Sequence, residues 1–299
     1  TPKPSSAASD VYKRQVLNNC NFHMYADDVQ IYVSGKVSEQ NLVLETINRN
    51  IESIVSWSLC NGLILNATKT QSMKVCKKSV FAYLLDLPKV TVGDITVPYS
   101  TSVKNLGLIL DQHLDFQDHI NFICKSVYGS LHSLNRLRYC TPLETRKRLF
   151  CALILPYFHY CDVIYSGSSI GTIQRLQLAL NSCLRYVLNL KKYDHISQFS
   201  NFLLGCDLST YLNFRAVTFL YKILNHPVPS YLLPYRSFAN SERTSNLSIP
   251  SFSRGCYYHT SFRVRSAVMW NNIQPHNIKR STSISCFKKS YLSSISVET

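Results

Sequence analysis

Two adjacent carboxylates, Asp27 and Asp28, stand between two short apolar runs near the start of the sequence. Two anions held this close repel each other unless cations neutralise them, so their natural chemical use is to bind a divalent metal ion. Oxygen ligands favour Mg2+ or Mn2+ over zinc. Adjacent aspartates also occur in solvated turns that carry no chemistry. The pair therefore predicts either a magnesium (or manganese) site or a plain acidic turn.

The residues on both sides of the pair predict the structure that presents it. Apolar and polar side chains alternate from Phe22 to Ala26 and again from Val29 to Val33, which is the pattern of half-buried strands. A tight turn at Asp27-Asp28 would join these strands into a hairpin with acid at its tip.

Downstream of the hairpin, helical and strand patterns follow each other, which indicates an α+β fold. Ser38 can cap a helix over residues 39–59, and Gly62 can end it. Further strands are predicted at 63–65, 71–76, 89–97 (folded at Gly93-Asp94) and 105–110.

From residue 116 onward the pattern is mainly helical. Apolar residues recur every three or four positions over 116–137, and the polar side of that helix carries Lys125, Arg136 and Arg138. A second helix is predicted to be capped at Thr141-Pro142 and to run to Leu155. Its three cations could face a backbone phosphate: Arg146, Lys147 and Arg148. Later segments predict helices at 173–188, 212–224, 266–273 and 285–293, with loops or weak strands over 237–261.

Positive charge is concentrated in the second part of the chain. Residues 1–115 hold 11 Lys+Arg against 10 Asp+Glu, whereas residues 116–299 hold 21 against 7. Such a field attracts a polyanion through counterion release and suits a protein that slides along nucleic acid. The alternative is a solubilising surface, but the excess is larger than solubility requires.

The composition excludes several classes of protein. At 45% hydrophobic residues over 299 positions the chain can build real cores, and no apolar run is long enough to span a bilayer. The 11 cysteines show no zinc-ligand spacing, which fits reduced thiols in a nuclear or cytoplasmic protein. We expect His159, Cys161 and Trp270 to be core residues.

Four ordered motifs carry a resemblance to a known family. They are YADD at 25–28, NGLILNATKT at 61–70, VKNLGLILD at 103–111 with LDFQDHI after it, and WNNIQPHNIKRSTSISCFKKSYL at 270–292. HYCDVIYSGSS at 159–169 extends the likeness. In this order they resemble the reverse transcriptases of retrotransposons without long terminal repeats, the LINE-type and jockey-like elements.

The resemblance implies roles for individual residues. Asp27 and Asp28 would take part in holding two metal ions, with Asp28 assisting or orienting. Lys69 would aid phosphoryl transfer by donating a proton or charge to pyrophosphate, although its position also fits a surface lysine after a strand. Tyr25 would pack near the primer end, or serve simply as core. Leu106, Gly107 and Asp111 would grip the primer, although a glycine within a strand can also mark a bulge.

The resemblance also predicts a domain organisation. Residues 1–15 are polar and look like translated adapter sequence, 16–111 would form a partial polymerase palm, 112–158 a helical thumb, and 159–299 a basic, mainly helical C-terminal region. A complete palm needs a further metal-binding aspartate and fingers upstream of Asn21, so we expect the chain to be the downstream part of the enzyme and inactive alone.

The sequence thus predicts part of an RNA-directed DNA polymerase whose partners are an RNA template, a DNA primer and deoxynucleoside triphosphates, with Mg2+ or Mn2+ as cofactor. Three alternatives stay open: a non-catalytic basic remnant that binds nucleic acid, another right-hand polymerase such as a maturase or viral RNA polymerase, and an unrelated helical scaffold for acidic partners. The WN tail and LDFQDHI argue against the second.

Overall fold

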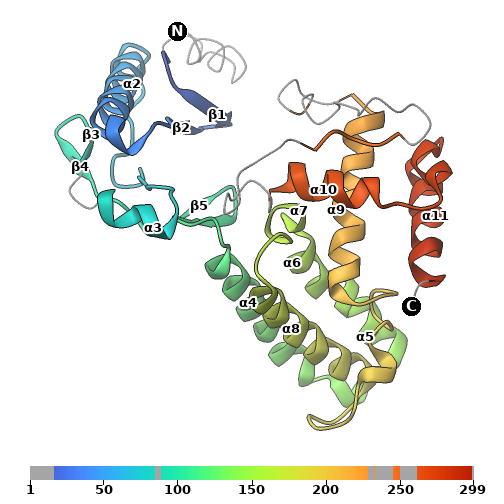
Figure 1. Cartoon of the computed structure of the whole chain (residues 1–299). Coiled ribbons are helices and arrows are strands. Elements are labelled where there is room, and N and C mark those ends of the chain that lie inside the picture. The colour runs from blue at the N-terminus through green and yellow to red at the C-terminus, as the bar shows by residue number, and fades with distance from the viewer. Residues whose placement is uncertain (1–16, 85–88, 228–231, 233–244, 250–260, 298–299) are drawn as a thin grey trace. The chain divides into compact units, whose positions relative to one another are not determined.

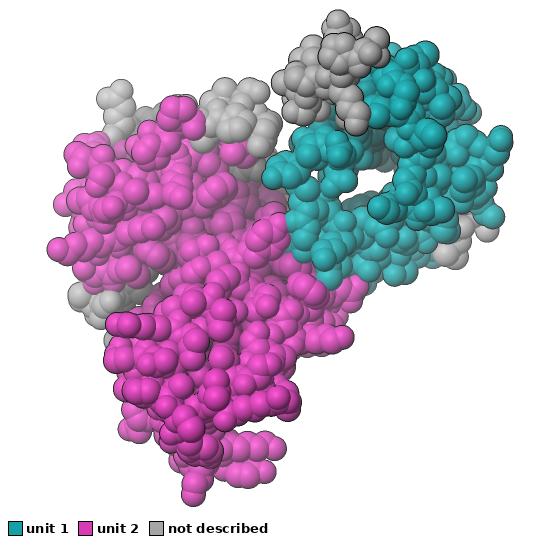
Figure 2. Space-filling model, turned by 180° about the vertical axis from the view of Figure 1, so that it is seen from behind, with its two compact units in different colours: residues 1–114 teal, residues 115–299 magenta. Residues whose placement is uncertain are grey.

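The change from strand to helical periodicity near residue 115 coincides with a division of the chain into two units. A computed structural model describes residues 17–84, 89–227, 232, 245–249 and 261–297. Unit 1 covers residues 1–114 and unit 2 covers residues 115–299 (Figure 2). The predicted adapter-like segment 1–15 and most of the predicted loop region 237–261 lie outside the described residues.

The described residues of unit 1 form three β-hairpins, one long helix and one short helix (Figure 1). Its strands are β1 (Asn21–Tyr25), β2 (Asp28–Tyr32), β3 (Val90–Val92), β4 (Ile95–Val97), β5 (Ser102–Asn105) and β6 (Leu108–Asp111). Its helices are α2 (Gln40–Cys60) and α3 (Lys78–Phe81), with short 3-10 turns η1 (Val37–Glu39) and η2 (Ala82–Leu84). The mixed α and β content is as predicted. The described strands, however, form three separate two-stranded antiparallel sheets and not one palm-like sheet.

The core of unit 1 lies between α2 and the β3–β4 hairpin. Leu44 of α2 is buried with Val90, Val92 and Val97, and further apolar residues of the same helix face pack around them. Asn48 of α2 reinforces this contact, because its Oδ1 accepts a hydrogen bond of 3.2 Å from the N–H of Thr91. The small size of this cluster means that hydrogen bonds carry much of the organisation of unit 1.

Several predicted local features of unit 1 are corrected by the structure. Residues 63–65 are not a strand, and within 71–76 only Ser72 forms an isolated bridge, to Tyr99. The entry to α2 is stabilised by the N–H of Lys36, which donates to Glu39 Oε2 at 3.1 Å, and not by a Ser38 cap. These segments are short, and neither periodicity nor propensity specifies strand pairing over so few residues.

The predicted strand 105–110 is in fact a hairpin turn with a strand on each side. Asn105 pairs with Leu108, so Leu106 and Gly107 form a two-residue loop. Their φ values are 47° and 89°. Positive φ at both central residues is what a type I′ turn requires, and such turns match the twist of the flanking strands. The glycine is therefore explained by the turn.

Unit 2 is built from helices. They are α4 (Gln117–Asn135), α5 (Leu143–Leu149), α6 (Leu155–His159), α7 (Asp162–Tyr165), α8 (Ile170–Leu188), α9 (Leu208–Asn225), α10 (Phe262–Asn271) and α11 (Ile284–Val297). Shorter turns are η3 (Arg138–Cys140), a π-helical turn η4 (Phe150–Ile154), η5 (Ser197–Phe199) and η8 (His276–Arg280). The predicted helix to Leu155 instead passes through the π turn into α6, which contains Pro156.

Hydrogen bonds at the helix ends explain where these helices begin and stop. Ser169 Oγ accepts from the N–H of Thr172 at the start of α8, and Asp207 Oδ2 accepts from the N–H of Thr210 at the start of α9. Asn189 ends α8 in the left-handed conformation, with φ of 57°. The predicted cap at Thr141 is wrong, because its hydroxyl donates backward to the carbonyl of Leu137 at 2.9 Å.

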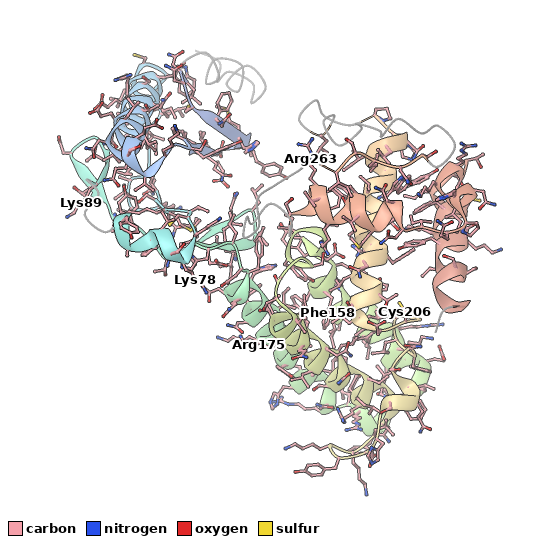
Figure 3. All side chains as sticks on the ribbon, in the orientation of Figure 1. Lys78, Lys89, Phe158, Arg175, Cys206 and Arg263 are labelled. Atoms are coloured by element: carbon pink, nitrogen blue, oxygen red, sulfur yellow. The ribbon has the colours of Figure 1, made fainter. Side chains whose placement is uncertain are left out.

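Among the described residues of unit 2, two apolar clusters hold the helices together, and α9 contributes to both. The first cluster joins α4, η4, α6, α7 and α8 to Leu208 and Leu212 of α9, and Phe158 lies within it (Figure 3). The second joins the later part of α9 to α10, η8 and α11, with Trp270 buried as predicted. The predicted thumb helices and the beginning of the predicted C-terminal region thus share one core.

The glycine of the β5–β6 turn gives a direct test of this fold. We expect Gly107→Ala to lower the unfolding free energy of unit 1 by about 1–2 kcal/mol, because a Cβ disfavours its φ of 89°. Gly129→Ala is the matched control: it lies within α4 with no atom near an added Cβ, so it should raise stability by about 0.5–1 kcal/mol. Urea unfolding with hydrogen exchange to separate the units measures both. Equal effects would contradict the assigned turn.

Candidate active site

The acidic pair lies on the β1–β2 hairpin, as predicted, but the turn is displaced by one residue. Tyr25 pairs with Asp28, so the two-residue loop is Ala26-Asp27, with Ala26 at a φ of 51°. Asp27 is at the tip and Asp28 is the first residue of β2. The predicted Asp-Asp turn is therefore corrected to an Ala-Asp turn.

This register gives the carboxylates of Asp27 and Asp28 different surroundings. Side chains alternate across a strand, and Met24 and Val29 form a half-buried cross-strand pair on one face. Tyr25 and Asp28 form the next pair, on the exposed face, where the ring of Tyr25 is 68% exposed. Asp28 therefore shares a surface with an exposed aromatic ring, while Asp27 occupies the loop beside it.

Two asparagines that the sequence analysis did not identify position this hairpin. Asn50 of α2 is buried and holds the chain just before β1: its Oδ1 accepts from the N–H of Asn18 and its Nδ2 donates to the carbonyl of Asn18, both at 2.8 Å. Asn105 of β5 donates to Gln30 Oε1 of β2 at 2.8 Å. A polar residue on the apolar side of α2 was the available signal for Asn50.

The second bond brings together two of the segments that the sequence analysis assigned to one site. It links the acidic hairpin to the β5–β6 hairpin, whose turn is Leu106-Gly107. Leu106 is 48% exposed at that turn. Asp111, at the end of β6, is buried and accepts a hydrogen bond of 2.9 Å from the N–H of His113, so its carboxylate takes part in a local turn.

Lys69 belongs to a separate turn over residues 66–70. Its N–H donates to Asn66, and its side chain is exposed. No group of three or more His, Cys, Asp or Glu side chains suited to hold a metal ion occurs in the part of the chain that the structure describes. Asp27 and Asp28 can thus offer carboxylate oxygens of the type that Mg2+ prefers, but they form a pair and not a group of three or more ligands.

The predicted phosphate-binding cations of unit 2 divide into two groups. Lys125, Arg136 and Arg148 are exposed, and Lys147 lies with its ammonium 5.2 Å from the ring centre of Phe202. These four side chains are accessible to an anion. Their placement leaves them as candidates for nucleic-acid binding.

Arg138 and Arg146 have a different role. Arg146 is buried, and its guanidinium donates to the carbonyls of Val187, Arg138 and Thr141 at 2.7–3.1 Å. Arg138 Nη2 donates to the carbonyls of Arg185 and Leu190. Cations that satisfy the last carbonyls of a helix stabilise its C-terminus, here that of α8. We therefore reassign Arg146 from phosphate to main-chain binding, and the half-buried Arg138 also donates to main chain.

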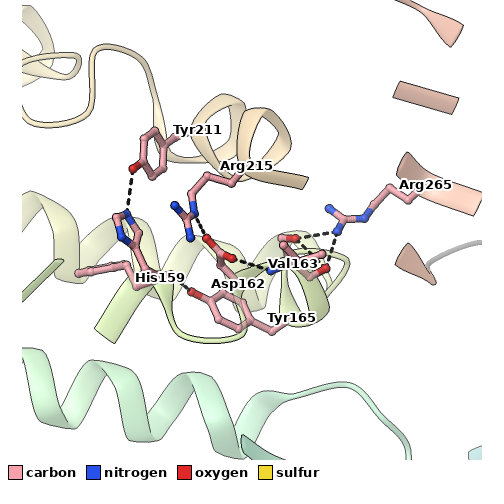
Figure 4. Close-up of polar contacts among 9 residues, drawn as sticks. His159, Asp162, Val163, Tyr165, Tyr211, Arg215 and Arg265 are labelled. Atoms are coloured by element: carbon pink, nitrogen blue, oxygen red, sulfur yellow. Dashed lines mark hydrogen bonds and ion pairs between the residues drawn. The ribbon is translucent and has the colours of Figure 1, made fainter. Parts of the chain in front are cut away.

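A buried polar cluster in unit 2 was also missed by the sequence analysis (Figure 4). Asp162 at the start of α7 forms an ion pair with Arg215 of α9 and accepts a bond of 2.8 Å from the N–H of Val163. Arg265 of α10 donates to the carbonyl of Val163 and to Ser166 Oγ. A lone carboxylate within the apolar run HYCDVIY was the signal that a buried partner exists.

Burial determines the proton affinities in this cluster. It raises the pKa of Asp162, and the hydrogen bond and charge of Arg215 offset part of that rise. Burial lowers the pKa of Arg265 to about 10. His159, whose Nε2 lies 2.8 Å from the hydroxyl of Tyr211, has its pKa lowered to about 4 by burial and by the charge of Arg215. The cluster joins α6 and α7 to α9 and α10, so its role is structural.

Comparison with known proteins gives one distant match. Over 167 residues the chain is 20% identical to the RNA-directed DNA polymerase from the mobile element jockey of Drosophila funebris, which covers 54% of this chain and 17% of that protein. The chain thus spans about a sixth of the length of this relative. No protein-family model matches, and no solved structure matches. The chain is distantly similar to a reverse transcriptase.

None of the described helices combines the length and the apolar character that crossing a membrane demands.

The main-chain role of Arg146 predicts the effect of removing it. We expect Arg146→Met to lower the unfolding free energy of unit 2 by about 3 kcal/mol, because three carbonyls lose their donor. Arg148→Met, an exposed arginine on the same helix, should change it by less than about 0.5 kcal/mol. Urea unfolding followed by circular dichroism compares them. A phosphate-binding role for Arg146 without a stability role would reverse this order.

The lowered pKa of His159 predicts a pH dependence of stability. Between pH 7 and about 4 the unfolded chain takes up a proton at His159, with an ordinary pKa near 6.5, while the folded chain does not. The unfolding free energy should therefore fall as pH falls through this range, and should fall less in His159→Gln. His119 acts with the same sign in both proteins, so the difference between them isolates His159. Parallel pH profiles would refute this assignment.

Proposed function

We propose that this chain is a downstream portion of the reverse transcriptase of a retrotransposon without long terminal repeats. In this proposal the β1–β2 hairpin contributes Asp27 and Asp28 to a site that adds deoxynucleotides to a DNA primer on an RNA template. The observation that carries the proposal is the two-residue turn with adjacent exposed carboxylates, in a chain distantly similar to the jockey polymerase.

The donor set of the hairpin suits the cofactor that this reaction uses. Mg2+ is commonly bound through one or two carboxylates together with substrate phosphates and water, so exposed aspartates at a hairpin tip are chemically appropriate ligands. When bound, two such ions supply activation of the primer 3′ hydroxyl and stabilisation of the leaving pyrophosphate. The position of Asp28 beside the exposed ring of Tyr25 supports a role for Tyr25 next to the primer terminus.

Other residues of unit 1 have roles that follow from this assignment. The hydrogen bond between Gln30 and Asn105 supports a common primer-binding surface formed by the acidic hairpin and the Leu106-Gly107 turn. We assign Lys69 to donate a proton or charge to pyrophosphate, which requires its exposed ammonium to approach the hairpin when substrate binds. In unit 2, we assign Lys125, Arg136, Lys147 and Arg148 to bind the phosphates of template and primer.

A second function is favoured by a specific observation. The described residues supply a pair of carboxylates and no larger metal-ligating group, whereas a two-metal polymerase site needs more. The second candidate is therefore a basic nucleic-acid-binding protein that does not catalyse polymerisation by itself. In both cases the ligand is nucleic acid.

Primer extension on an RNA template with Mg2+ separates the two functions. We expect no product from this chain alone, and extension by a longer protein translated with the sequence upstream of it. In the longer protein, Asp27→Asn should reduce extension by about a thousandfold or more, because it removes a metal ligand. Asp94→Asn, which alters an exposed aspartate at the turn of the β3–β4 hairpin, is the matched control and should leave extension unchanged.

Metal binding by the chain itself gives a readout that does not depend on activity. Millimolar Mn2+ should broaden the amide NMR signals of residues 25–30, and Asp27→Asn with Asp28→Asn should abolish this broadening while Asp94→Asn preserves it. Primer extension that survives Asp27→Asn would remove the catalytic assignment and leave the second candidate. Mn2+ broadening that does not affect residues 25–30 would have the same consequence.

A further inference from the structure

Two tyrosines of unit 2 are almost fully exposed. Tyr139, in the turn between α4 and α5, is 84% exposed, and Tyr193, in the loop after α8, is 86% exposed. Aromatic rings normally bury most of their surface, because they contribute a large hydrophobic stabilisation when they do. A ring presented to solvent on an ordered backbone is therefore available to bind a planar partner.

Arg138 and Arg146, whose guanidinium groups donate to main-chain carbonyls, hold in place the main chain that carries these tyrosines. Arg138 donates to the carbonyl of Leu190 at 2.6 Å, which fixes the turn of Tyr139 against the loop of Tyr193. In that loop, Asp194 Oδ2 accepts from the N–H of Lys191 at 2.6 Å and closes a turn around Tyr193. The loop after α8 lies at the end of unit 2 remote from α10 (Figure 1).

The surroundings of both rings are strongly basic. The two segments that meet here, residues 136–148 and 185–195, together contain eight Lys and Arg residues against two acids, Glu144 and Asp194. The guanidinium of Arg138 lies 5.9 Å from the ring centre of Tyr139, and the ammonium of Lys192 lies 5.4 Å from that of Tyr193. Asp194 is engaged by the main chain, so positive charge dominates around the rings.

We infer that Tyr139 and Tyr193 form a stacking surface for single-stranded nucleic acid. Bases would stack on the two rings, and the exposed cations Arg136, Arg148, Lys191 and Lys192 would neutralise the phosphates between and beside them. Exposed rings within a basic surface favour a single strand over a duplex, because a duplex keeps the faces of its bases stacked on one another. An acidic polypeptide would use the charge but not the rings.

This inference deepens the nucleic-acid-binding part of the proposed function and rests on it to that extent. It concerns unit 2, whereas the proposed metal-binding hairpin lies in unit 1. The surface can therefore bind a single strand whether or not the hairpin takes part in catalysis.

The test is fluorescence anisotropy with a labelled single-stranded 15-mer of thymidine or uridine. We expect Tyr139→Ala and Tyr193→Ala each to weaken binding by roughly tenfold, and the Tyr→Phe variants to bind as the unchanged chain does. Tyr83→Ala is the matched control, because Tyr83 is 73% exposed in unit 1. Both target rings are exposed, so their removal should preserve the fold, which circular dichroism checks.

Salt dependence distinguishes stacking from charge. Lys191→Ala with Lys192→Ala should lower the slope of log affinity against log salt by about 1.4 for a single strand, whereas the Tyr→Ala variants should leave the slope unchanged. The inference is overturned if the Tyr→Ala variants bind as tightly as the unchanged chain. It is also overturned if a duplex loses as much affinity on these substitutions, or if polyglutamate competes as well as the oligonucleotide.

Measurement in an Asp27→Asn, Asp28→Asn background keeps the two proposals apart. In that background the longer protein should lose primer extension and keep oligonucleotide binding, whereas extension that persists would remove the polymerase assignment and leave the stacking surface intact. Extension by the longer protein that is insensitive to both tyrosines, with oligonucleotide binding equally insensitive, would remove the stacking surface alone.

Discussion

The arrangement of unit 2 depends on the ion pair between the buried carboxylate of Asp162 and the partly exposed Arg215. Arg215 lies on α9 between Leu212, which belongs to the first apolar cluster, and Val217, which belongs to the second. Burying a carboxylate is costly unless donors surround it, and here Arg215 and the N–H of Val163 both contact it, with Arg265 nearby. The pair therefore fixes how α7 meets α9, because another register of these helices would leave the buried carboxylate of Asp162 without Arg215, while Arg265 joins α10 to α7 through Val163 and Ser166.

Unit 1 is organised by a different kind of contact. Its apolar cluster is small, and its strands form three isolated hairpins, each of which would be marginally stable alone. Side-chain amides supply the connections: Asn50 holds the chain before β1, Asn48 ties α2 to β3, and Asn105 links two hairpins. The acidic turn is thus held by a few specific hydrogen bonds, and its two carboxylates are exposed because Asp27 lies in the loop and Asp28 on the exposed face of β2.

The sequence predicted those features that follow from periodicity and missed those that depend on distant partners. Apolar spacing located the helices now labelled α2, α4 and α8, and the alternation around Asp27 located the first hairpin. The turn itself was displaced by one residue, because alternation sets the face of a strand but not where pairing ends. Arg146 was assigned to phosphate because sequence shows a charge without its surroundings. Its partner Val187 is 41 positions away.

The main-chain role of Arg146 changes how the positive charge of unit 2 is interpreted. The charge count of residues 116–299 includes arginines whose donors are committed to main-chain carbonyls, so the number of phosphate contacts is smaller than the count suggests. A guanidinium in such bonds nevertheless remains charged and still contributes to the field around it. Arg138 and Arg146 thereby have two effects: they bind the end of α8 next to the two segments that carry the exposed tyrosines, and they add to the positive potential there. Structure and electrostatics at this end of unit 2 depend on the same side chains, so a substitution that removes either arginine alters both.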